Sequence, residues 1–237
     1  KDNPQNLTNL INRYLTPMTH LVMKSGGTID KYIGDALMAF WNAPIEGDDI
    51  SHRVRSIETA LKMYDSLDEL NVQLKKEGKK ELAIGIGINT GNVVVGNMGS
   101  DQRFDYTCLG DAVNLAARLE GQTKQYGVKI LLGEETTKLI GDKFKFIELD
   151  KIAVKGKKEG VKVYTVINEK FDYLQHDLFL KLYKERKWLE ANKLLNKCIE
   201  INPMLEYYYN MMKDRVDDLK VNDPGKDWDK VYRAKSK

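Results

Sequence analysis

Apolar residues recur along the chain with two different periods, one typical of helices and one typical of strands. From Leu7 to Met23 and again from Ile50 to Leu74 they recur every three or four residues, which predicts two amphipathic helices. Gly26-Gly27 is expected to end the first helix. Between the helices, Thr28 to Phe40 contains two short strand-like runs around Gly34-Asp35, which predicts a β-hairpin.

The middle of the chain continues this mixture of strands and helices. Apolar runs at Leu82–Ile88 and Val93–Gly96, separated by Asn89-Thr90-Gly91, predict a second hairpin. Further strands are expected at 104–109, 129–132, 144–149 and 161–167, and further helices after Gly110-Asp111 and at 134–140. Helices set against a mostly antiparallel sheet give an α+β class, for which a ferredoxin-like core is a natural candidate.

The chain changes character near position 168. Seventeen of its 18 glycines precede Asn168, so the turns that a strand-rich fold needs are confined to the first part. The last 70 residues nevertheless hold 10 of the 21 aromatic side chains, which is too many for a solvated linker. We therefore predict two units, an α+β domain at 1–167 and an all-helical appendage at 168–237.

Composition and charge exclude several classes of protein. The chain is 42% apolar and 31% charged with a net charge of +3, which excludes a disordered chain and argues against a nucleic-acid binder. No apolar run approaches the roughly 18 to 20 residues that span a bilayer. Two cysteines, Cys108 and Cys198, are too few for a disulfide scaffold and favour a reducing compartment. Because the chain starts at Lys1 in mid-pattern, we expect it to be part of a longer protein.

The predicted hairpin carries the first candidate chemistry, since motifs for P-loops, zinc proteases and serine hydrolases are missing. Asp35 in the Gly34-Asp35 turn could hold Mg²⁺ against phosphate oxygens, although Asp30 and Asp35 could equally satisfy only turn amides. Lys31, four residues earlier, could donate to a nucleobase or simply extend into solvent. The three histidines stand singly on helical patterns, where packing or surface roles are the simpler interpretation.

Two further polar groups could bind a nucleotide. Asn114 and Arg118 share one face of the helix that starts at Gly110-Asp111, where they could hold a ribose and stabilise charge on a phosphate. The alternative is an ordinary surface pair. Lys155-Gly156 forms a basic turn between two expected strands, which could bind a polyphosphate or could only protect a sheet edge.

Several of these segments resemble the catalytic domain of class III nucleotide cyclases. The matching segments are GGTIDKYIGDALMAF at 26–40, NTGNVVVGNMG at 89–99, YTCLGDAVNLAARLE at 106–120 and, more weakly, VKGK at 154–157. They follow the family's order from Leu7 to Ile167. The resemblance implies the ferredoxin-like cyclase fold and an enzyme, a phosphorus–oxygen lyase, that converts ATP to 3′,5′-cyclic AMP and pyrophosphate for signal transduction.

The resemblance also implies a role for each candidate residue. Asp35 would bind the catalytic metal ions, and Lys31 with Thr107 would contact adenine, as in bacterial adenylate cyclases. Asn114 would orient the ribose and Arg118 would stabilise the pentavalent phosphate. Lys155 would hold the terminal phosphates.

The same family implies two Mg²⁺ or Mn²⁺ ions per site and a homodimer in which Lys31, Thr107, Asn114 and Arg118 face the metal carboxylates of the other copy. The family's other metal aspartate precedes the helix at Leu7–Met23, so this chain starts too late to contain it. Thr107 is typical of the bicarbonate-responsive branch. A catalytically silent nucleotide-sensing or scaffold dimer, or a guanylate cyclase, remains the alternative.

The tail has a resemblance of its own. Trp188, Ala191, Leu195 and Pro203 are spaced as in a tetratricopeptide helix–turn–helix, which suggests a protein partner. The alternative is that the tail only packs on the cyclase domain. The segment Trp228–Tyr232 resembles the end of bacterial cyclases with upstream membrane helices, which implies a cytoplasmic domain in a parent protein that is anchored in the cell membrane.

Overall fold

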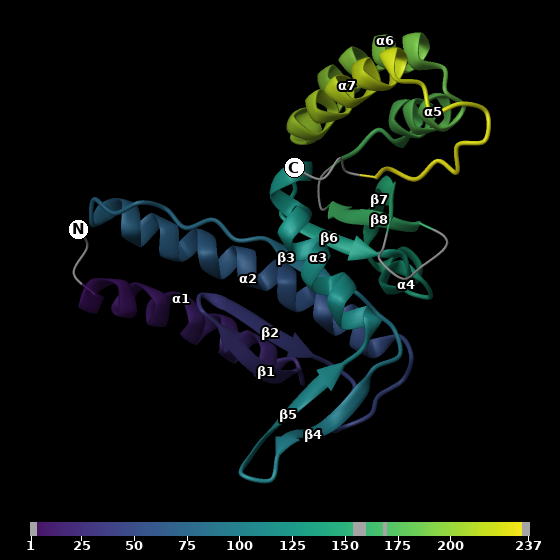
Figure 1. The fold of residues 1–237 in the computed structure, drawn as a ribbon. Helices are drawn as coiled ribbons and strands as arrows, with labels where there is room; N and C mark the ends of the chain where they lie inside the picture. Colours follow the sequence, from purple (N-terminus) through teal and green to yellow (C-terminus); the bar gives the residue numbers. More distant parts are fainter. Residues whose placement is uncertain (1–3, 154–159, 168–169, 234–237) are drawn as a thin grey trace. The chain divides into compact units, whose positions relative to one another are not determined.

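The computed structural model describes residues 4–153, 160–167 and 170–233 (Figure 1). The chain divides into two compact units. The first comprises Lys1–Ile84 and Ile88–Asn114, and the second comprises Gly85–Gly87 and Leu115–Lys237. Within the described residues, no helix combines the length and apolar character needed to cross a bilayer. Cys108 and Cys198 are both buried and unbridged.

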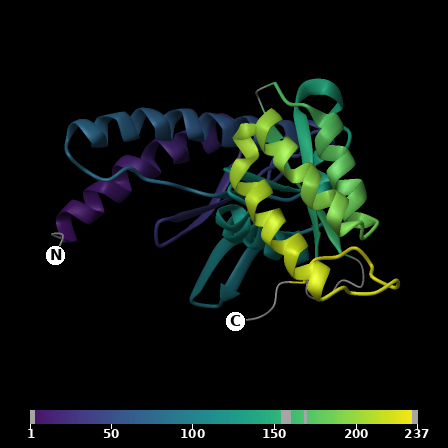
Figure 2. The same cartoon turned by 90° about the horizontal axis from the view of Figure 1, so that it is seen from above.

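In the first unit, the two predicted amphipathic helices pack side by side and antiparallel (Figures 1 and 2). They are α1 (Pro4–Lys24) and α2 (Ser51–Lys76). Arg13 in the middle of α1 forms an ion pair with Glu77 just after α2, at 2.8 Å. At the opposite ends, Arg55 of α2 donates to the carbonyl oxygen of Ser25 at 3.3 Å. Both predicted helices are confirmed, and their apolar faces supply buried residues: Met18, Val22, Ile57, Leu67 and Leu74.

The predicted hairpin follows α1. It consists of β1 (Thr28–Ile33) and β2 (Ala36–Phe40), joined by the two-residue turn Gly34-Asp35. Gly34 has a φ of 64°, a backbone conformation that glycine adopts at little cost. Pairing is regular except at a bulge in β1, where Ile29 faces Ala39 and Lys31 already faces Met38. Asp30 is therefore the extra residue, and it is left without a partner in the ladder.

The second predicted hairpin is wrong in its pairing. β3 (Ile86–Ile88) lies beside β6, whereas β4 (Val94–Ser100) pairs with β5 (Arg103–Leu109). Residues 97–100, for which no strand is predicted, form the end of β4, because a tight turn at Asp101-Gln102 lets seven residue pairs align. The segment Asn89–Gly91 packs on the start of α3 (Asp111–Tyr126) instead, where the Asn89 side chain donates to the Ala112 carbonyl at 3.0 Å.

The second unit is built on a four-stranded sheet of order β3-β6-β8-β7. The last two neighbours, β8 and β7, are antiparallel, as are β6 and β8. The remaining elements of this part are β6 (Ile130–Gly133), α4 (Glu134–Thr137), the short 3₁₀ helix Gly141–Lys143, β7 (Lys145–Ile152) and β8 (Val161–Ile167). These positions agree with the expected strands and helices, and the predicted α+β class is confirmed.

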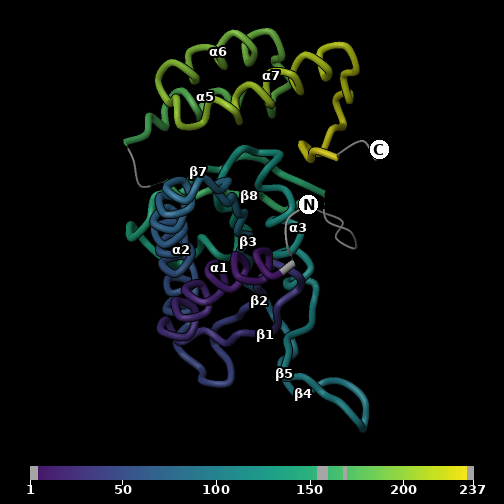
Figure 3. Tube along the Cα trace, turned by 90° about the vertical axis from the view of Figure 1, so that its left-hand side faces the viewer, coloured from purple at the N-terminus to yellow at the C-terminus, as the bar shows by residue number. Residues whose placement is uncertain are grey.

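The tail is helical, as its apolar pattern predicts, and belongs to the second unit. Figures 1 and 3 show its helices beside β7 and β8. The helices are α5 (Tyr173–Lys184), α6 (Trp188–Ile201), a 3₁₀ turn (Pro203–Leu205) and α7 (Glu206–Val221). They share one apolar core with the sheet and α3, which includes Leu119, Leu149, Phe179, Leu195, Tyr208 and Met212. The boundary at 167/168 and the tetratricopeptide likeness stay predictions.

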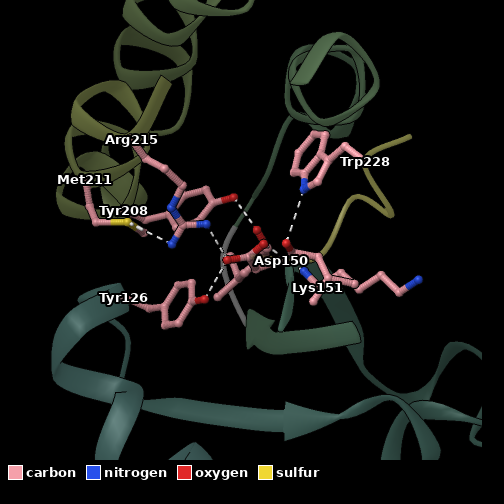
Figure 4. Close-up of polar contacts among 9 residues, drawn as sticks. Tyr126, Asp150, Lys151, Tyr208, Met211, Arg215 and Trp228 are labelled. Carbon is pink, nitrogen blue, oxygen red and sulfur yellow. Dashed lines mark hydrogen bonds and ion pairs between the residues drawn. The ribbon is translucent and has the colours of Figure 1, made fainter. Parts of the chain in front are cut away.

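A buried ion pair joins the tail to the sheet in this unit (Figure 4). Arg215 of α7 pairs with Asp150 of β7, and their side chains are 5% and 2% exposed. Tyr126 of α3 donates its hydroxyl proton to the same carboxylate at 2.6 Å. Beside it, Tyr208 donates to the carbonyl oxygen of Leu149 at 2.6 Å. The carboxylate is thus held by donors from α3 and α7 together.

Removing one partner of this ion pair should destabilise the protein much more than replacing both. Arg215→Met leaves a buried carboxylate without its cation, and we expect the free energy of unfolding to fall by about 3–5 kcal/mol. Asp150→Leu combined with Arg215→Met removes both charges and should recover most of that loss. Urea unfolding of the two variants measures the difference. If Arg215→Met were as stable as the wild type, the ion pair would contribute nothing to the free energy of unfolding.

His176 of α5 predicts a pH dependence of stability. It is fully buried, its Nε2 lies 2.8 Å from the carbonyl oxygen of Glu148 and its Nδ1 lies 3.0 Å from the Tyr209 hydroxyl. Burial lowers the pKa of His176, so the folded state binds a proton less readily than the unfolded state.

The free energy of unfolding should therefore fall as the pH drops below about 6.5, the pKa of an unfolded histidine, with a slope of at most about 1.4 kcal/mol per pH unit. In His176→Gln this component should vanish, whereas it should persist in His20→Gln because His20 is exposed. Urea unfolding between pH 5 and 8 measures the slope. Identical slopes in all three proteins would remove His176 as the cause.

Candidate functional site

Two of the residues implied in purine binding are in direct contact. Lys31 lies in β1 and Thr107 in β5, and the Lys31 ammonium donates to the Thr107 hydroxyl oxygen at 3.3 Å. The Lys31 side chain is 44% exposed, while Thr107 is buried at 6% exposure. The aromatic rings of Phe40 and Tyr106, 6.0 Å apart, bring the two hairpins together nearby. The sequence separates these residues by 76 positions, and the first unit joins them.

A buried carboxylate lies beneath this pair. The Asp30 side chain is 0% exposed and accepts the Thr107 hydroxyl proton at 2.6 Å and the backbone N–H of Cys108 at 3.1 Å. Its other oxygen lies 3.1 Å from the Lys31 ammonium. Burial alone would raise the pKa of Asp30, but the donors Thr107, Cys108 and Lys31 outweigh it and hold this pKa below its usual value. Asp30 is therefore ionised at neutral pH.

This role of Asp30 was not predicted from the sequence. The interpretation that Asp30 satisfies turn amides is wrong, because its partners lie on β5 and not in the Gly34-Asp35 turn. Neighbouring residues of a regular strand point to opposite faces. The bulge breaks that alternation, so Asp30 and Lys31 both reach Thr107. A bulge has no clear sequence signature. The one available signal is the adjacent acid and base, Asp30 and Lys31, in a strand-like run.

Asp35, the candidate metal ligand, lies exposed at the tip of the β1–β2 hairpin. Among the described residues, no three His, Cys, Asp or Glu side chains gather into a group that could hold a metal ion. Mg²⁺ is commonly bound through one or two carboxylates together with substrate phosphates and water. An exposed carboxylate such as Asp35 fits that kind of partial site, and its role as a metal ligand stays a prediction.

Asn114 lies exposed in the first turn of α3. The start of this helix is positioned by Gly91, because a side chain at that place would come within 2.8 Å of the Ala112 methyl group. This close approach, together with the hydrogen bond from Asn89 to Ala112, explains why the Asn89–Gly91 motif accompanies the helix start. The structure thus fixes the backbone that carries Asn114, while the ribose contact stays a prediction.

Arg118 lies in α3 within the second unit, half-buried. Its guanidinium donates to the carbonyl oxygen of Ala153 at 3.2 Å, directly after β7. Arg118 also borders a cavity of about 290 Å³, whose other lining residues are Gln122, Gln125, Tyr126, Ile152, Ala153, Tyr232 and Arg233. Lys155, the candidate for the terminal phosphates, lies outside the described residues. An arginine beside an open cavity is suited to an anionic group.

The geometry of Lys31 and Thr107 offers two adjacent polar groups of different kinds. An ammonium can only donate, while a hydroxyl both donates and accepts. Two such groups side by side can recognise a flat heterocycle that presents an acceptor next to a donor.

Comparisons with known proteins agree with the fold and the motifs. The family model of the adenylate and guanylate cyclase catalytic domain matches residues 1–168. An adenylate cyclase of Anabaena cylindrica is 39% identical over 166 residues, which is 69% of this chain. The match spans 32% of that relative, so the chain covers about a third of its length.

Solved structures of two cyclases have the same fold. The crystal structure of the adenylyl cyclase CyaB from P. aeruginosa has a TM-score of 0.65 and 35% identity, and the match covers 72% of this chain and 86% of that one. The guanylyl cyclase Cya2 has a TM-score of 0.63 and 31% identity, with 73% and 86% covered. The predicted class III cyclase fold is thereby confirmed, and the structure adds helices after the sheet region. The chain belongs to the family of adenylate and guanylate cyclase catalytic domains.

Proposed function

We propose that this chain is the catalytic portion of an adenylate cyclase, which converts ATP to 3′,5′-cyclic AMP and pyrophosphate. The observation that carries the proposal is the contact between Lys31 and Thr107. Relatives named adenylate cyclase support the same conclusion, among them the Anabaena protein. The proposal concerns the substrate, because the family includes cyclases of both purine nucleotides.

The two purines differ in the groups that this pair would contact. Adenine presents an acceptor at N1 and a donor amino group at N6, whereas guanine presents a donor at N1 and an acceptor at O6. The Lys31 ammonium can only donate and therefore matches adenine N1. The Thr107 oxygen can accept from the N6 amino group. A glutamate in place of Lys31 would reverse this preference, because a carboxylate only accepts.

The reaction forms a bond between the ribose 3′-oxygen and the α-phosphorus and breaks the bond from that phosphorus to the bridging oxygen of the leaving pyrophosphate. The 3′-hydroxyl proton is released to water or to the leaving pyrophosphate. Asn114 would hold the ribose so that the 3′-oxygen is in line for attack. Arg118 would donate to the phosphate oxygens on which charge develops in the transition state. Divalent metal ions, when bound with Asp35 as one ligand, would lower the pKa of the 3′-hydroxyl and neutralise phosphate charge.

The proposal includes a homodimer in which each site combines Asp35 of one copy with Lys31, Thr107, Asn114 and Arg118 of the other. It also includes two Mg²⁺ or Mn²⁺ ions per site. We further propose that a longer parent protein is anchored at the cell membrane and that the helical tail binds a protein partner. The latter two are supported only by the resemblance of Trp228–Tyr232 and of the Trp188–Pro203 spacing to other proteins.

Exchanging the purine-contacting pair should change nucleotide preference. In Lys31→Glu with Thr107→Cys, two contacts that favour adenine become neutral or favour guanine, and the ratio of kcat/KM for ATP over GTP should fall about 100-fold or more. The measurement is initial-rate kinetics of the full-length protein with each nucleotide. Lys24→Glu in the exposed last turn of α1 changes charge equally and is the matched control. An unchanged ratio would remove Lys31 and Thr107 from the purine pocket.

Mixing two inactive variants tests the shared site. Asp35→Asn and Arg118→Ala should each lower kcat by about 100-fold or more, because each removes an interaction made in the transition state. In a mixed dimer, one site carries both substitutions and the other carries neither. Activity should therefore return on mixing, to at most about a quarter of the wild type by statistics.

The melting temperature of each variant serves as the folding control for this mixing experiment. Mixed variants that stay inactive while size-exclusion chromatography shows dimers would contradict a site shared between two copies. Turnover of GTP in place of ATP by the wild type would instead favour a guanylate cyclase, and nucleotide binding without turnover would favour a silent module.

A further inference from the structure

Asp30 is the one carboxylate among the described residues that contacts both Lys31 and Thr107. Its side chain is completely buried, so it cannot itself reach a nucleotide. It is presented to β5 by the bulge in β1, which turns two consecutive side chains toward the same neighbour.

The buried charge of Asp30 fixes where the hydroxyl proton of Thr107 lies. An ionised carboxylate can only accept, so at 2.6 Å from Asp30 the Thr107 hydroxyl must be the donor. Once its single proton is directed at Asp30, the hydroxyl oxygen offers only lone pairs to other groups. Thr107 then behaves toward a base as a pure acceptor. A threonine without such a partner could rotate its proton toward the base and serve as a donor instead.

We propose that Asp30 is the residue that makes Thr107 selective for adenine, by holding the hydroxyl proton and by anchoring Lys31 beside it. A pure acceptor at this position favours the amino group at adenine N6 and repels the carbonyl at guanine O6. The ion pair at 3.1 Å keeps the Lys31 ammonium next to that acceptor. Asp30 is thus a positioning residue that acts through its two neighbours. This inference rests on the proposed adenylate cyclase function.

Three variants separate this role from a merely structural one. Asp30→Leu keeps the same number of side-chain heavy atoms and the same branching, although it is larger, and removes the acceptor, so Thr107 regains the freedom to donate. We expect discrimination between ATP and GTP to fall about tenfold or more. Asp30→Asn keeps an acceptor for Thr107 and Cys108 but loses the ion pair to Lys31, and should raise KM for ATP with a smaller loss of discrimination.

The third variant is a rescue. Adding Thr107→Asp to Asp30→Leu places an acceptor-only group at position 107, which no longer needs a partner to hold a proton. Discrimination against GTP should return to within a few-fold of the wild type. A purely structural role of Asp30 predicts no such recovery, because Thr107→Asp restores neither the bond to the Cys108 N–H nor the original contact between β1 and β5.

Two measurements are made on the full-length protein: kcat/KM for ATP and GTP, and calorimetric binding of the non-cyclisable 3′-deoxy-ATP and 3′-deoxy-GTP. Asp105→Leu, which removes an exposed carboxylate from the same strand as Thr107, is the matched control. Thermal unfolding shows which variants are folded.

Unchanged discrimination in folded Asp30→Leu, or no recovery in the folded double variant, would overturn the inference. Failure of the proposed function would look different. The wild type itself would then make no cyclic AMP and would not prefer 3′-deoxy-ATP.

Discussion

A buried carboxylate must be balanced by a positive charge or by hydrogen-bond donors, and this constraint shapes each unit of the chain. In the first unit Asp30 is satisfied only when β1 and β5 lie together, since Thr107 and the Cys108 N–H are on β5. An unpaired buried charge would cost several kcal/mol, so an arrangement that separates the two strands is strongly disfavoured. The same bonds that join the strands set the geometry of the Lys31–Thr107 pair.

The second unit uses the same constraint for a different purpose. Asp150 is held by Arg215 from the tail and by Tyr126 from α3, with all three side chains buried. This contact fixes the tail helices on the sheet and involves none of the residues implied in nucleotide binding. The difference lies in the neighbours. Asp30 contacts a half-exposed lysine that a ligand can reach, whereas both side-chain donors to Asp150 are enclosed in the core.

Most elements could be predicted from sequence because their signals are local. The helices and the β1–β2 hairpin follow from apolar period and turn residues within about 15 to 25 neighbouring positions. The β3 pairing could not be predicted in this way, since Ile86 bonds to Lys129, 43 positions away, and the nearby Val93–Gly96 run looked like an equally good partner. The polar end of β4 was missed because Asn97–Ser100 has little apolar character, and its strand is fixed by pairing with β5.

In the candidate site, too, local signals could be predicted and long-range contacts could not. Motif resemblance indicated Lys31, Thr107, Asn114 and Arg118, but it could not indicate a contact that depends on a backbone irregularity. Asp30 reaches Thr107 only because one extra residue in β1 shifts the register.

The tail carries no cyclase motif, yet it contacts the end of β7, which also bonds to the candidate catalytic residue Arg118. Tyr232 accepts from the backbone N–H of Ala153 and donates its own N–H to Lys151, so the end of the chain extends the sheet along β7. The carbonyl of that same Ala153 accepts from Arg118. One peptide segment at the end of β7 is thus held on one side by the tail and bonded on the other by Arg118. The aromatic residues of the tail form much of the apolar core that holds the tail on the sheet. This packing role accounts for the abundance of aromatic residues in a segment without catalytic motifs.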